Sequence, residues 1–230
     1  MLISEIYCSR QGEGLLTGTP SVFVRTSGCN LRCGFCDTPF ASWNPMGDSL
    51  QIEEIVHRIQ KVAGGAKHVV ITGGEPMIVK DLAALCKKIR SSGFHITIET
   101  AGTVFQEVEC QLMSISPKFG NSDPSVERAG EWRQRHTATR YRPGVVVRLI
   151  SEYDFQLKFV LDVPEDMDEI LDYLGVLEQP DSQRVLLMPQ GVEQDELDLR
   201  RRWLEPLCEE RGFVFCPRMH IEWYGNRRGT

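Results

Sequence analysis

The feature that most restricts the fold is a short stretch with three cysteines, Gly28-Cys29-Asn30-Leu31-Arg32-Cys33-Gly34-Phe35-Cys36. The thiols have the spacing C-x3-C-x2-C and follow directly after an apolar run at 21–24, which is typical of a β-strand. Three thiolates without a fourth nearby do not complete a tetrahedral site, so they suit a metal centre that keeps one position open. We therefore expect a loop at a strand end where a small molecule can reach a metal.

Two other interpretations of these cysteines are open. A closed zinc site needs a fourth ligand, which Cys8 or a distant histidine could supply. A disulfide with one spare thiol would need an oxidising compartment, whereas residues 1–5 do not begin a signal peptide and cytosolic thiols stay reduced. The remaining cysteines lie in apolar or helical patterns, and we expect them to be buried small hydrophobes. They are Cys8, Cys86, Cys110, Cys208 and Cys216.

Length and composition are those of one globular domain, because the chain has 230 residues, of which 41% are hydrophobic and 25% charged. No apolar run approaches the length of a membrane span. The formal net charge of −6 argues against bulk electrostatic binding to nucleic acid. We therefore expect a cytoplasmic domain that binds neither membrane nor nucleic acid.

Strand and helix patterns alternate along most of the chain. Strands are expected at 2–8, 19–27, 67–72, 94–99, 111–116, 155–161, 184–188 and 213–216, and helices at 50–59, 81–92, 143–152, 165–177 and 193–211. Such alternation favours a parallel sheet with helices packed outside it. After the first hairpin there are about six strand–helix steps, too few for an eight-stranded barrel. The prediction is an α/β fold, a partial, open (β/α) barrel of about six strands with its ligand-binding turns at the carboxyl ends of the strands.

Two segments interrupt this alternation. Residues 121–142 are polar, basic in their second half, and include Trp132. A solvated surface insertion is the first expectation for such a composition, and a lid over the active site is the alternative. Residues 217–230 form an aromatic and basic tail. With no internal repeat or linker, a single domain spanning 1–230 is predicted to carry both segments.

A second motif, Thr72-Gly73-Gly74-Glu75-Pro76, directly follows a predicted strand. Glycines let a ligand lie against the backbone, and a neighbouring carboxylate can receive an ammonium group. Alone, this glycine turn could simply end the strand before Pro76 and have no role in binding. Together with the cysteine loop, in which Phe35 precedes the last cysteine, it resembles the radical S-adenosylmethionine (SAM) superfamily.

This resemblance implies a 4Fe–4S cluster held by Cys29, Cys33 and Cys36, with SAM on the open iron and its amino group at Glu75. It also implies an electron donor such as flavodoxin or ferredoxin. One electron from the cluster would break the sulfonium C–S bond of SAM, and the resulting 5′-deoxyadenosyl radical would abstract a hydrogen atom from the substrate.

Within the superfamily, nearly the whole chain resembles the 7-carboxy-7-deazaguanine synthase family of the queuosine pathway. The segments that carry this likeness are 11–14, 22–25, 36–38, 71–76, 99–102, 116–118, 156–160 and 218–220. The resemblance implies the rearrangement of 6-carboxy-5,6,7,8-tetrahydropterin to 7-carboxy-7-deazaguanine with loss of ammonia, using SAM and Mg²⁺. It further implies a homodimer.

The same resemblance assigns residues to each ligand. The SAM-binding set is Phe35, Cys36, Asp37, Gly74, Glu75, Ser116, Pro117, Lys118 and Gln190. The substrate-binding set is Arg10, Gln11, Gly12, Arg25 and Thr72. Thr38 is the magnesium ligand, which suits a cation that takes hard oxygen ligands. Some relatives end with the chain terminus close to substrate, but the longer tail here does not carry that contact over to Thr230.

Two rival functions are open. A glycyl-radical-enzyme activase would share the cluster and SAM but act on a protein. The segment 11–14 and Arg25 favour instead a small carboxylated heterocycle. A zinc-binding interaction protein is the alternative from a different class.

Overall fold

A nine-stranded sheet runs through the chain in the computed structural model, which describes residues 1–230. Its order is β3-β1-β2-β4-β5-β6-β7-β8-β9. The strands are β1 Leu2–Arg10, β2 Pro20–Thr26, β3 Asp48–Ser49, β4 His68–Gly73, β5 His95–Thr100, β6 Leu112–Ile115, β7 Phe155–Leu161, β8 Val185–Pro189 and β9 Val214–Phe215. β1 pairs antiparallel with β2 and β3, whereas neighbours from β2 through β9 pair in parallel.

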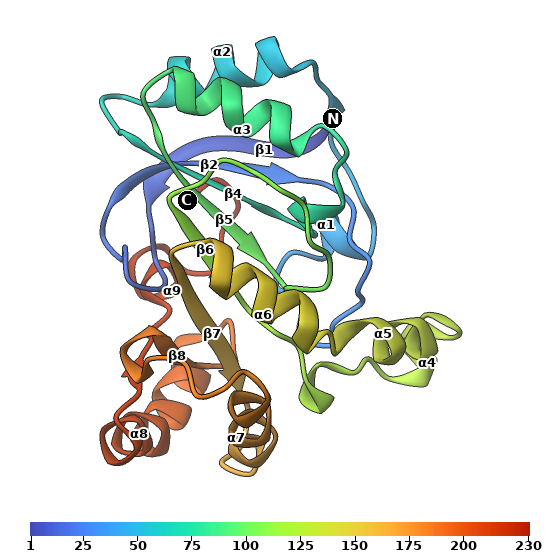
Figure 1. Cartoon of the computed structure of the whole chain (residues 1–230), viewed down its shortest axis with the longest axis vertical. Coiled ribbons are helices and arrows are strands. Elements are labelled where there is room, and N and C mark those ends of the chain that lie inside the picture. The colour runs from blue at the N-terminus through green and yellow to red at the C-terminus, as the bar shows by residue number, and fades with distance from the viewer.

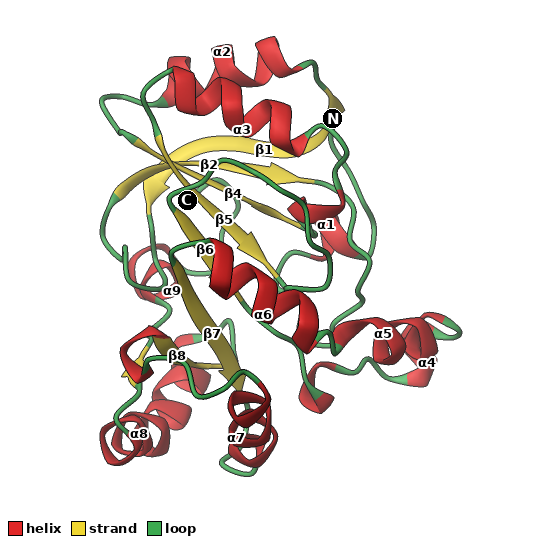
Figure 2. Cartoon of the chain, in the orientation of Figure 1, coloured by secondary structure: helices red, strands yellow, loops and turns green.

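The longer helices lie along the outer side of this curved sheet (Figures 1 and 2). They are α2 Ile52–Val62, α3 Leu82–Ser91, α6 Pro143–Glu152, α7 Asp166–Val176 and α8 Gln194–Arg211. In α2, Ile55, Val56 and Ile59 are buried and the helix packs on β1 and β2, while Glu54 and Arg58 pair on its exposed face. This is the apolar stripe expected of a helix that covers a sheet.

The parallel strands are buried on both faces, which explains their continuous apolar sequences. In β4, Val69, Val70 and Ile71 are all fully buried. The register sets Arg25 of β2 beside Thr72 of β4, so the loops that follow these strands leave the sheet side by side. The amide of Gly74 donates to the carbonyl of Thr26 at 3.1 Å. The sheet therefore brings the cysteine loop and the Gly-Gly-Glu-Pro motif together.

The predicted fold class is confirmed, because the sheet is mostly parallel and its end strands, β3 and β9, do not pair with each other. Helix α6 and strand β7 have the predicted bounds. The number of strands differs, with nine in place of about six. The prediction left the first hairpin out of its count, and β3 has only two residues, too short to show a pattern, whereas β9 lies within the strand expected at 213–216.

Residues 121–142 are more ordered than a solvated insertion would be. They include α4 Val126–Ala129 and α5 Trp132–Arg140, which follow the 3₁₀ turn η2 Gly120–Ser122. Figure 1 shows both helices beyond the end of α6, away from the concave side of the sheet. The segment was not predicted to be helical because its sequence lacks a periodic apolar stripe.

The tail of residues 217–230 turns back to the concave side and contains α9 Met219–Tyr224. The amide of Met219 donates to the carbonyl of Gly12 at 3.0 Å, so the tail lies against the loop that follows β1. The shorter elements are α1 Pro39–Ser42, η1 Pro76–Ile78 and η3 Ser182–Arg184. None of the helices combines the length and the apolar character that crossing a membrane requires.

Candidate active site

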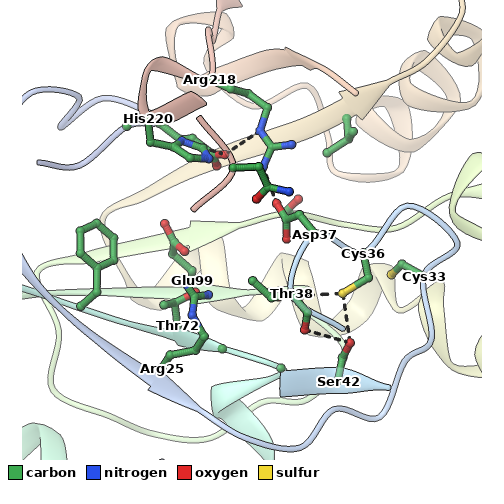
Figure 3. A pocket seen from close by; sticks show the side chains of 18 of the residues that line it. Arg25, Cys33, Cys36, Asp37, Thr38, Ser42, Thr72, Glu99, Arg218 and His220 are labelled. Carbon is green, nitrogen blue, oxygen red and sulfur yellow. Dashed lines mark hydrogen bonds and ion pairs between the residues drawn. The ribbon is translucent and has the colours of Figure 1, made fainter. Parts of the chain in front are cut away.

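The carboxyl ends of the parallel strands surround a cavity of about 490 Å³. Figure 3 shows Cys33, Cys36 and Thr38 on one side of it and Arg25 and Thr72 on another. Most of the residues singled out from the sequence lie in its wall. They are Arg10, Gln11, Gly12, Arg25, Cys29, Cys33, Phe35, Cys36, Asp37, Thr38, Thr72, Gly74, Ser116, Lys118 and Gln190. Glu75 and Pro117 are not among the lining residues.

The three clustered cysteines line the same cavity, and no other cysteine does. All eight cysteines are free thiols. No three cysteine, histidine or acidic side chains are placed to hold a single metal ion. A 4Fe–4S cluster binds each thiolate through a different iron atom, so its ligands need not converge on one point. The arrangement therefore fits a three-thiolate cluster with one open iron better than a closed zinc site.

The other five cysteines were expected to be buried. Cys86, Cys208 and Cys216 are buried and Cys110 is half-buried, but Cys8 is exposed. The expectation is wrong for Cys8, because β1 lies near the edge of the sheet, covered only by the two-residue β3.

Burial keeps the thiols of two of the three clustered cysteines protonated. It raises the pKa of Cys29 and of Cys33 to about 12, so both are neutral in the protein without its cofactor. Thiolates are the form that binds a metal, so loading a cluster would release protons. Ser27 Oγ and Asn30 Oδ1, close to Cys29 in sequence, are buried without a hydrogen-bond partner. Unpaired buried polar atoms are uncommon, so this loop fits a bound group that would complete it.

The paired glycines allow two loops to touch. A Cβ atom on Gly74 would lie 2.0 Å from the carbonyl oxygen of Gly28, closer than any real contact. Gly73 has a φ of +133°, which favours glycine. The amide of Glu75 also donates to the carbonyl of Gly28 at 2.9 Å. The glycines therefore serve the close packing of this motif on the start of the cysteine loop, as well as exposing backbone to the cavity.

Glu75 differs from its sequence-based expectation, because its side chain is fully buried and does not reach the cavity. One carboxylate oxygen accepts hydrogen bonds from the amide of Met77 at 3.0 Å and the hydroxyl of Thr100 at 2.8 Å. The other accepts from the amide of Ala101 at 2.8 Å. Burial raises its pKa, although these donors oppose the shift. The carboxylate ties the loop after β4 to the end of β5 through these three hydrogen bonds, and its contact with the SAM amine stays a prediction.

The Ser-Pro-Lys segment presents one cation to the cavity. Lys118 Nζ donates to the carbonyl oxygen of Ser116 at 2.8 Å and to its hydroxyl at 2.6 Å. Burial lowers the pKa of Lys118, while nearby Cys33 opposes this shift. Pro117 lies outside the lining. The assignment of Pro117 to the SAM-binding set stays a prediction.

One edge of the Arg25 guanidinium is hydrogen-bonded within the protein, and the other edge is open to the cavity. Its Nε donates to Glu5 Oε2 at 3.0 Å and its Nη2 donates to the hydroxyl of Tyr7 at 3.2 Å. Its Nη1 has no hydrogen-bond partner in the protein, and the side chain lines the cavity. Gln11 lies nearby in the wall, with its amide donating to Glu99 Oε1 at 3.3 Å. These groups can recognise a carboxylated ring with amide and amine edges.

A buried charge network lies above this region and was not assigned a role from the sequence. It is centred on Glu13, whose carboxylate binds Lys158 Nζ and Arg218 Nε, the latter at 3.1 Å. His220 Nδ1 is 3.9 Å from the same carboxylate. Burial alone would raise the pKa of Glu13, but Lys158 and Arg218 outweigh it and hold the pKa well below its usual range.

Arg218 links this network to the cysteine loop. Its Nη2 pairs with Asp37 Oδ2, as Figure 3 shows, and its Nη1 donates to the carbonyl of Gly191 at 2.6 Å. Burial would raise the pKa of Asp37, but Arg218 reverses the shift, so Asp37 is ionised beside the last cluster cysteine. The only sequence signal for this network was the presence of Glu13, Lys158 and Arg218 in segments that resemble the family.

The end of the tail also enters the cavity wall. Arg228 Nε donates to Glu5 Oε1 at 2.7 Å, and its guanidinium stacks 4.0 Å from the centre of the Phe40 ring. Thr230 lines the cavity, although the substrate contact of the chain terminus in some relatives was not carried over to it from the sequence. By contrast, no residue from 121–142 lines it, so that segment is not a lid in this structure.

Comparisons with known proteins identify the family of this chain. The profile described as the radical SAM superfamily matches residues 23–142. A 7-carboxy-7-deazaguanine synthase from Rhodopirellula baltica is 48% identical over 231 residues, which cover 100% of this chain and 89% of the relative. One from Halobacterium salinarum is 42% identical, covering 95% and 88%. The crystal structure of QueE from Escherichia coli superposes with a TM-score of 0.66 at 25% identity, covering 95% of this chain and 94% of that chain. This chain therefore belongs to the 7-carboxy-7-deazaguanine synthase family of the radical SAM superfamily.

Proposed function

We propose that this enzyme converts 6-carboxy-5,6,7,8-tetrahydropterin to 7-carboxy-7-deazaguanine with loss of ammonia. The observation that carries the proposal is that one cavity contains both the three free cluster cysteines and the half-open guanidinium of Arg25. The family assignment favours this function over a glycyl-radical-enzyme activase and over a zinc-binding interaction protein.

Cys29, Cys33 and Cys36 would hold the 4Fe–4S cluster. When bound, the cluster and SAM would supply the radical chemistry that removes a hydrogen atom from the substrate. Lys118 offers an ammonium to the carboxylate of SAM, and Ser116 orients that ammonium through two hydrogen bonds. Phe35, Asp37, Gly74 and Gln190 complete this part of the wall. The main chain at Gly73–Gly74, and not the buried Glu75, is left to face the SAM amine.

At the substrate end, Arg25 would bind the pterin carboxylate through its free Nη1, while Glu5 and Tyr7 hold the rest of the guanidinium in place. Gln11 and Thr72 would meet the polar edge of the ring, together with Arg10 and the backbone of Gly12. We further propose that Thr38 supplies a hydroxyl oxygen to Mg²⁺, whose other ligands are substrate oxygens and waters. Its place in the wall, two residues after Cys36, supports this role.

The cellular setting is part of the proposal. Eight unpaired cysteines suit the reducing cytoplasm. The cluster needs an electron donor such as flavodoxin or ferredoxin, and we propose a homodimer on the basis of the family resemblance. Neither nucleic acid nor membrane is proposed as a partner, given the net charge of −6.

The decisive test is an anaerobic assay with reductant, SAM, Mg²⁺ and the carboxypterin. The parent should form the deazaguanine. Arg25→Lys should release 5′-deoxyadenosine with little product, because an ammonium cannot reproduce the planar guanidinium held by Glu5 and Tyr7. Thr38→Ala should lose most turnover at limiting Mg²⁺, whereas Thr38→Ser should retain much of it.

The matched control is Arg58→Lys, which changes an exposed arginine on α2 and should leave turnover unchanged. Product formation at the parent rate by both Arg25→Lys and Thr38→Ala across a magnesium titration would place the carboxypterin site elsewhere.

A further inference from the structure

The middle of the cysteine loop, around Cys33, is bound by residues 120–142, which lie outside the cavity. The amide of Gly34 donates to the carbonyl of Ser122 at 2.9 Å, and the carbonyl of Gly34 accepts from Arg128 Nη1 at 2.8 Å. The amide of Arg32 donates to Nδ1 of His136 at 3.1 Å. The backbone on both sides of Cys33 is therefore fixed by this segment.

His136 occupies the centre of these contacts and is fully buried. Its Nδ1 accepts from the Arg32 amide, so the ring hydrogen must lie on Nε2, which is 3.0 Å from the hydroxyl of Ser122. That hydroxyl donates its own hydrogen to the carbonyl of Phe119 at 2.6 Å. The three bonds form a directed chain from the cysteine loop to the carbonyl of Phe119, in the segment between β6 and η2. This chain defines one neutral tautomer of the imidazole.

Two cation–π contacts lie beside these hydrogen bonds, where residues 120–142 meet the cysteine loop. The Arg32 guanidinium lies 4.0 Å from the centre of the Trp132 ring, one helical turn before His136. Arg128 lies 4.1 Å from the centre of the Trp43 ring, whose indole nitrogen donates to the carbonyl of Cys33 at 3.1 Å. Trp132 and His136 are four residues apart, so they project from the same face of α5. That face meets the cysteine loop.

We propose that His136 is a positioning residue for the 4Fe–4S cluster, acting through the peptide bond between Leu31 and Arg32. The inference rests on the proposed function only in that the three cysteines hold this cluster. His136 binds the N–H of that peptide, and Arg32 Nη1 binds its carbonyl at 2.7 Å. The peptide is thereby held at both ends, between the first two cluster ligands.

The orientation of this peptide matters for the cluster because the preceding amide faces a ligand sulfur. The N–H of Leu31 donates to Cys29 Sγ at 3.4 Å. Hydrogen bonds to ligand sulfurs tune the reduction potential of an iron–sulfur cluster. A peptide freed from His136 can rotate, and this would weaken the bond to Cys29 Sγ. His136 therefore influences both retention of the cluster and its potential.

Two substitutions separate the two sides of the imidazole. His136→Asn places an amide oxygen where Nδ1 lies and keeps an acceptor for the Arg32 amide. His136→Gln reaches the position of Nε2, keeps the contact with Ser122 and loses that acceptor. Gln134→Ala, at an exposed position of the same helix, is the control.

The full-length protein, reconstituted with iron and sulfide, should assemble a cluster in all variants. In His136→Gln, iron should be lost to a chelator roughly fivefold faster, as expected for one lost hydrogen bond. The EPR spectrum and midpoint potential of the reduced cluster should also shift, and exchange of the Arg32 amide should speed up by a similar factor. His136→Asn and Gln134→Ala should resemble the parent in all of these measurements.

The inference is overturned if His136→Gln keeps the parent potential and amide exchange, or if the Asn and Gln variants are altered equally. Should His136→Gln not fold, the ¹⁵N-labelled parent is measured instead: Asp123 Oδ1 lies 3.5 Å from Nε2 and also favours the hydrogen there, so Nδ1 should resonate as an unprotonated ring nitrogen, and a protonated Nδ1 would overturn the inference. A parent protein that binds no cluster would instead refute the proposed function.

Discussion

Replacing Arg218 by methionine is the sharpest test of how the cavity is held together. Its side chain is 7% exposed and serves three acceptors, Glu13, Asp37 and the carbonyl of Gly191. Methionine fills a similar volume but offers no donor. Asp37 would then lose its cation, and Glu13 would keep only Lys158 and the more distant His220.

Removing one partner of a buried charge pair typically costs ~3–5 kcal/mol, because the other charge remains desolvated. We expect a loss of at most about 3 kcal/mol, the lower bound, since Lys158 still neutralises Glu13 and water can reach Asp37, whose side chain is 38% exposed. At ~2–4 °C per kcal/mol for a chain of this size, the melting temperature should fall by roughly 6–12 °C. A loss of about 3 kcal/mol is a large part of the ~5–15 kcal/mol that typically stabilises a domain.

The assay is urea unfolding of the cofactor-free protein at pH 7, followed by circular dichroism. Arg218→Met is compared with Asp37→Asn and with the double variant, which should be less destabilised than the sum of the two because both remove the same interaction. Arg201→Met, which breaks an exposed pair with Glu205, should barely move the midpoint. If Arg218→Met costs no more than this control, or the two changes are additive, the network does not act as a unit.

Three further changes follow from the site. Glu75→Gln should lower the melting temperature of the cofactor-free protein and leave SAM affinity in the folded protein unchanged; full stability with weakened SAM binding would return Glu75 to the cavity wall. Burial lowers the pKa of His68 to about 4, so its contribution to stability should be complete above pH 6.5 and decline as the pH falls toward 4. Urea midpoints across this range should show the decline, and His68→Gln should make it shallower without removing it, because burial also lowers the pKa of His136 to about 4. Arg228→Ala should release the tail from Glu5, seen as faster amide exchange in residues 225–230 and a higher KM; unchanged exchange would contradict the contact.

Local patterns were sufficient to predict most of the fold. The buried strands are continuous apolar runs and the covering helices have apolar stripes, so α6 and β7 were found at their actual bounds. Helix α5 was missed because its stability comes from tertiary contacts, such as the packing of Trp132 on Arg32, which no periodicity records. Propensity and spacing describe what a segment can form, but not which partner fixes it.

In the site, too, local patterns predicted some features, while others depend on tertiary contacts. The spacing of the cysteines and the paired glycines predicted which loops would meet. It could not show that the Glu75 carboxylate turns toward donors at Thr100 and Ala101, on the adjacent strand and the loop after it. The pairing of Glu13 with Arg218 spans 205 residues and leaves no local trace in the sequence.

The position of Arg218 near the end of the chain also means that the cysteine loop is synthesised long before the residue that pairs with Glu13 and Asp37. Roughly 180 residues lie between Cys36 and Arg218, so at ~5–20 residues per second the three thiols leave the ribosome about 10–40 s before the segment that joins Glu13 to Asp37. Until then, the carboxyl ends of the early strands are open to water and to any iron–sulfur carrier. A ribosome that stalls before Arg218 would therefore hold a chain whose cysteine loop is complete but whose cavity lacks the residues of the tail that line it.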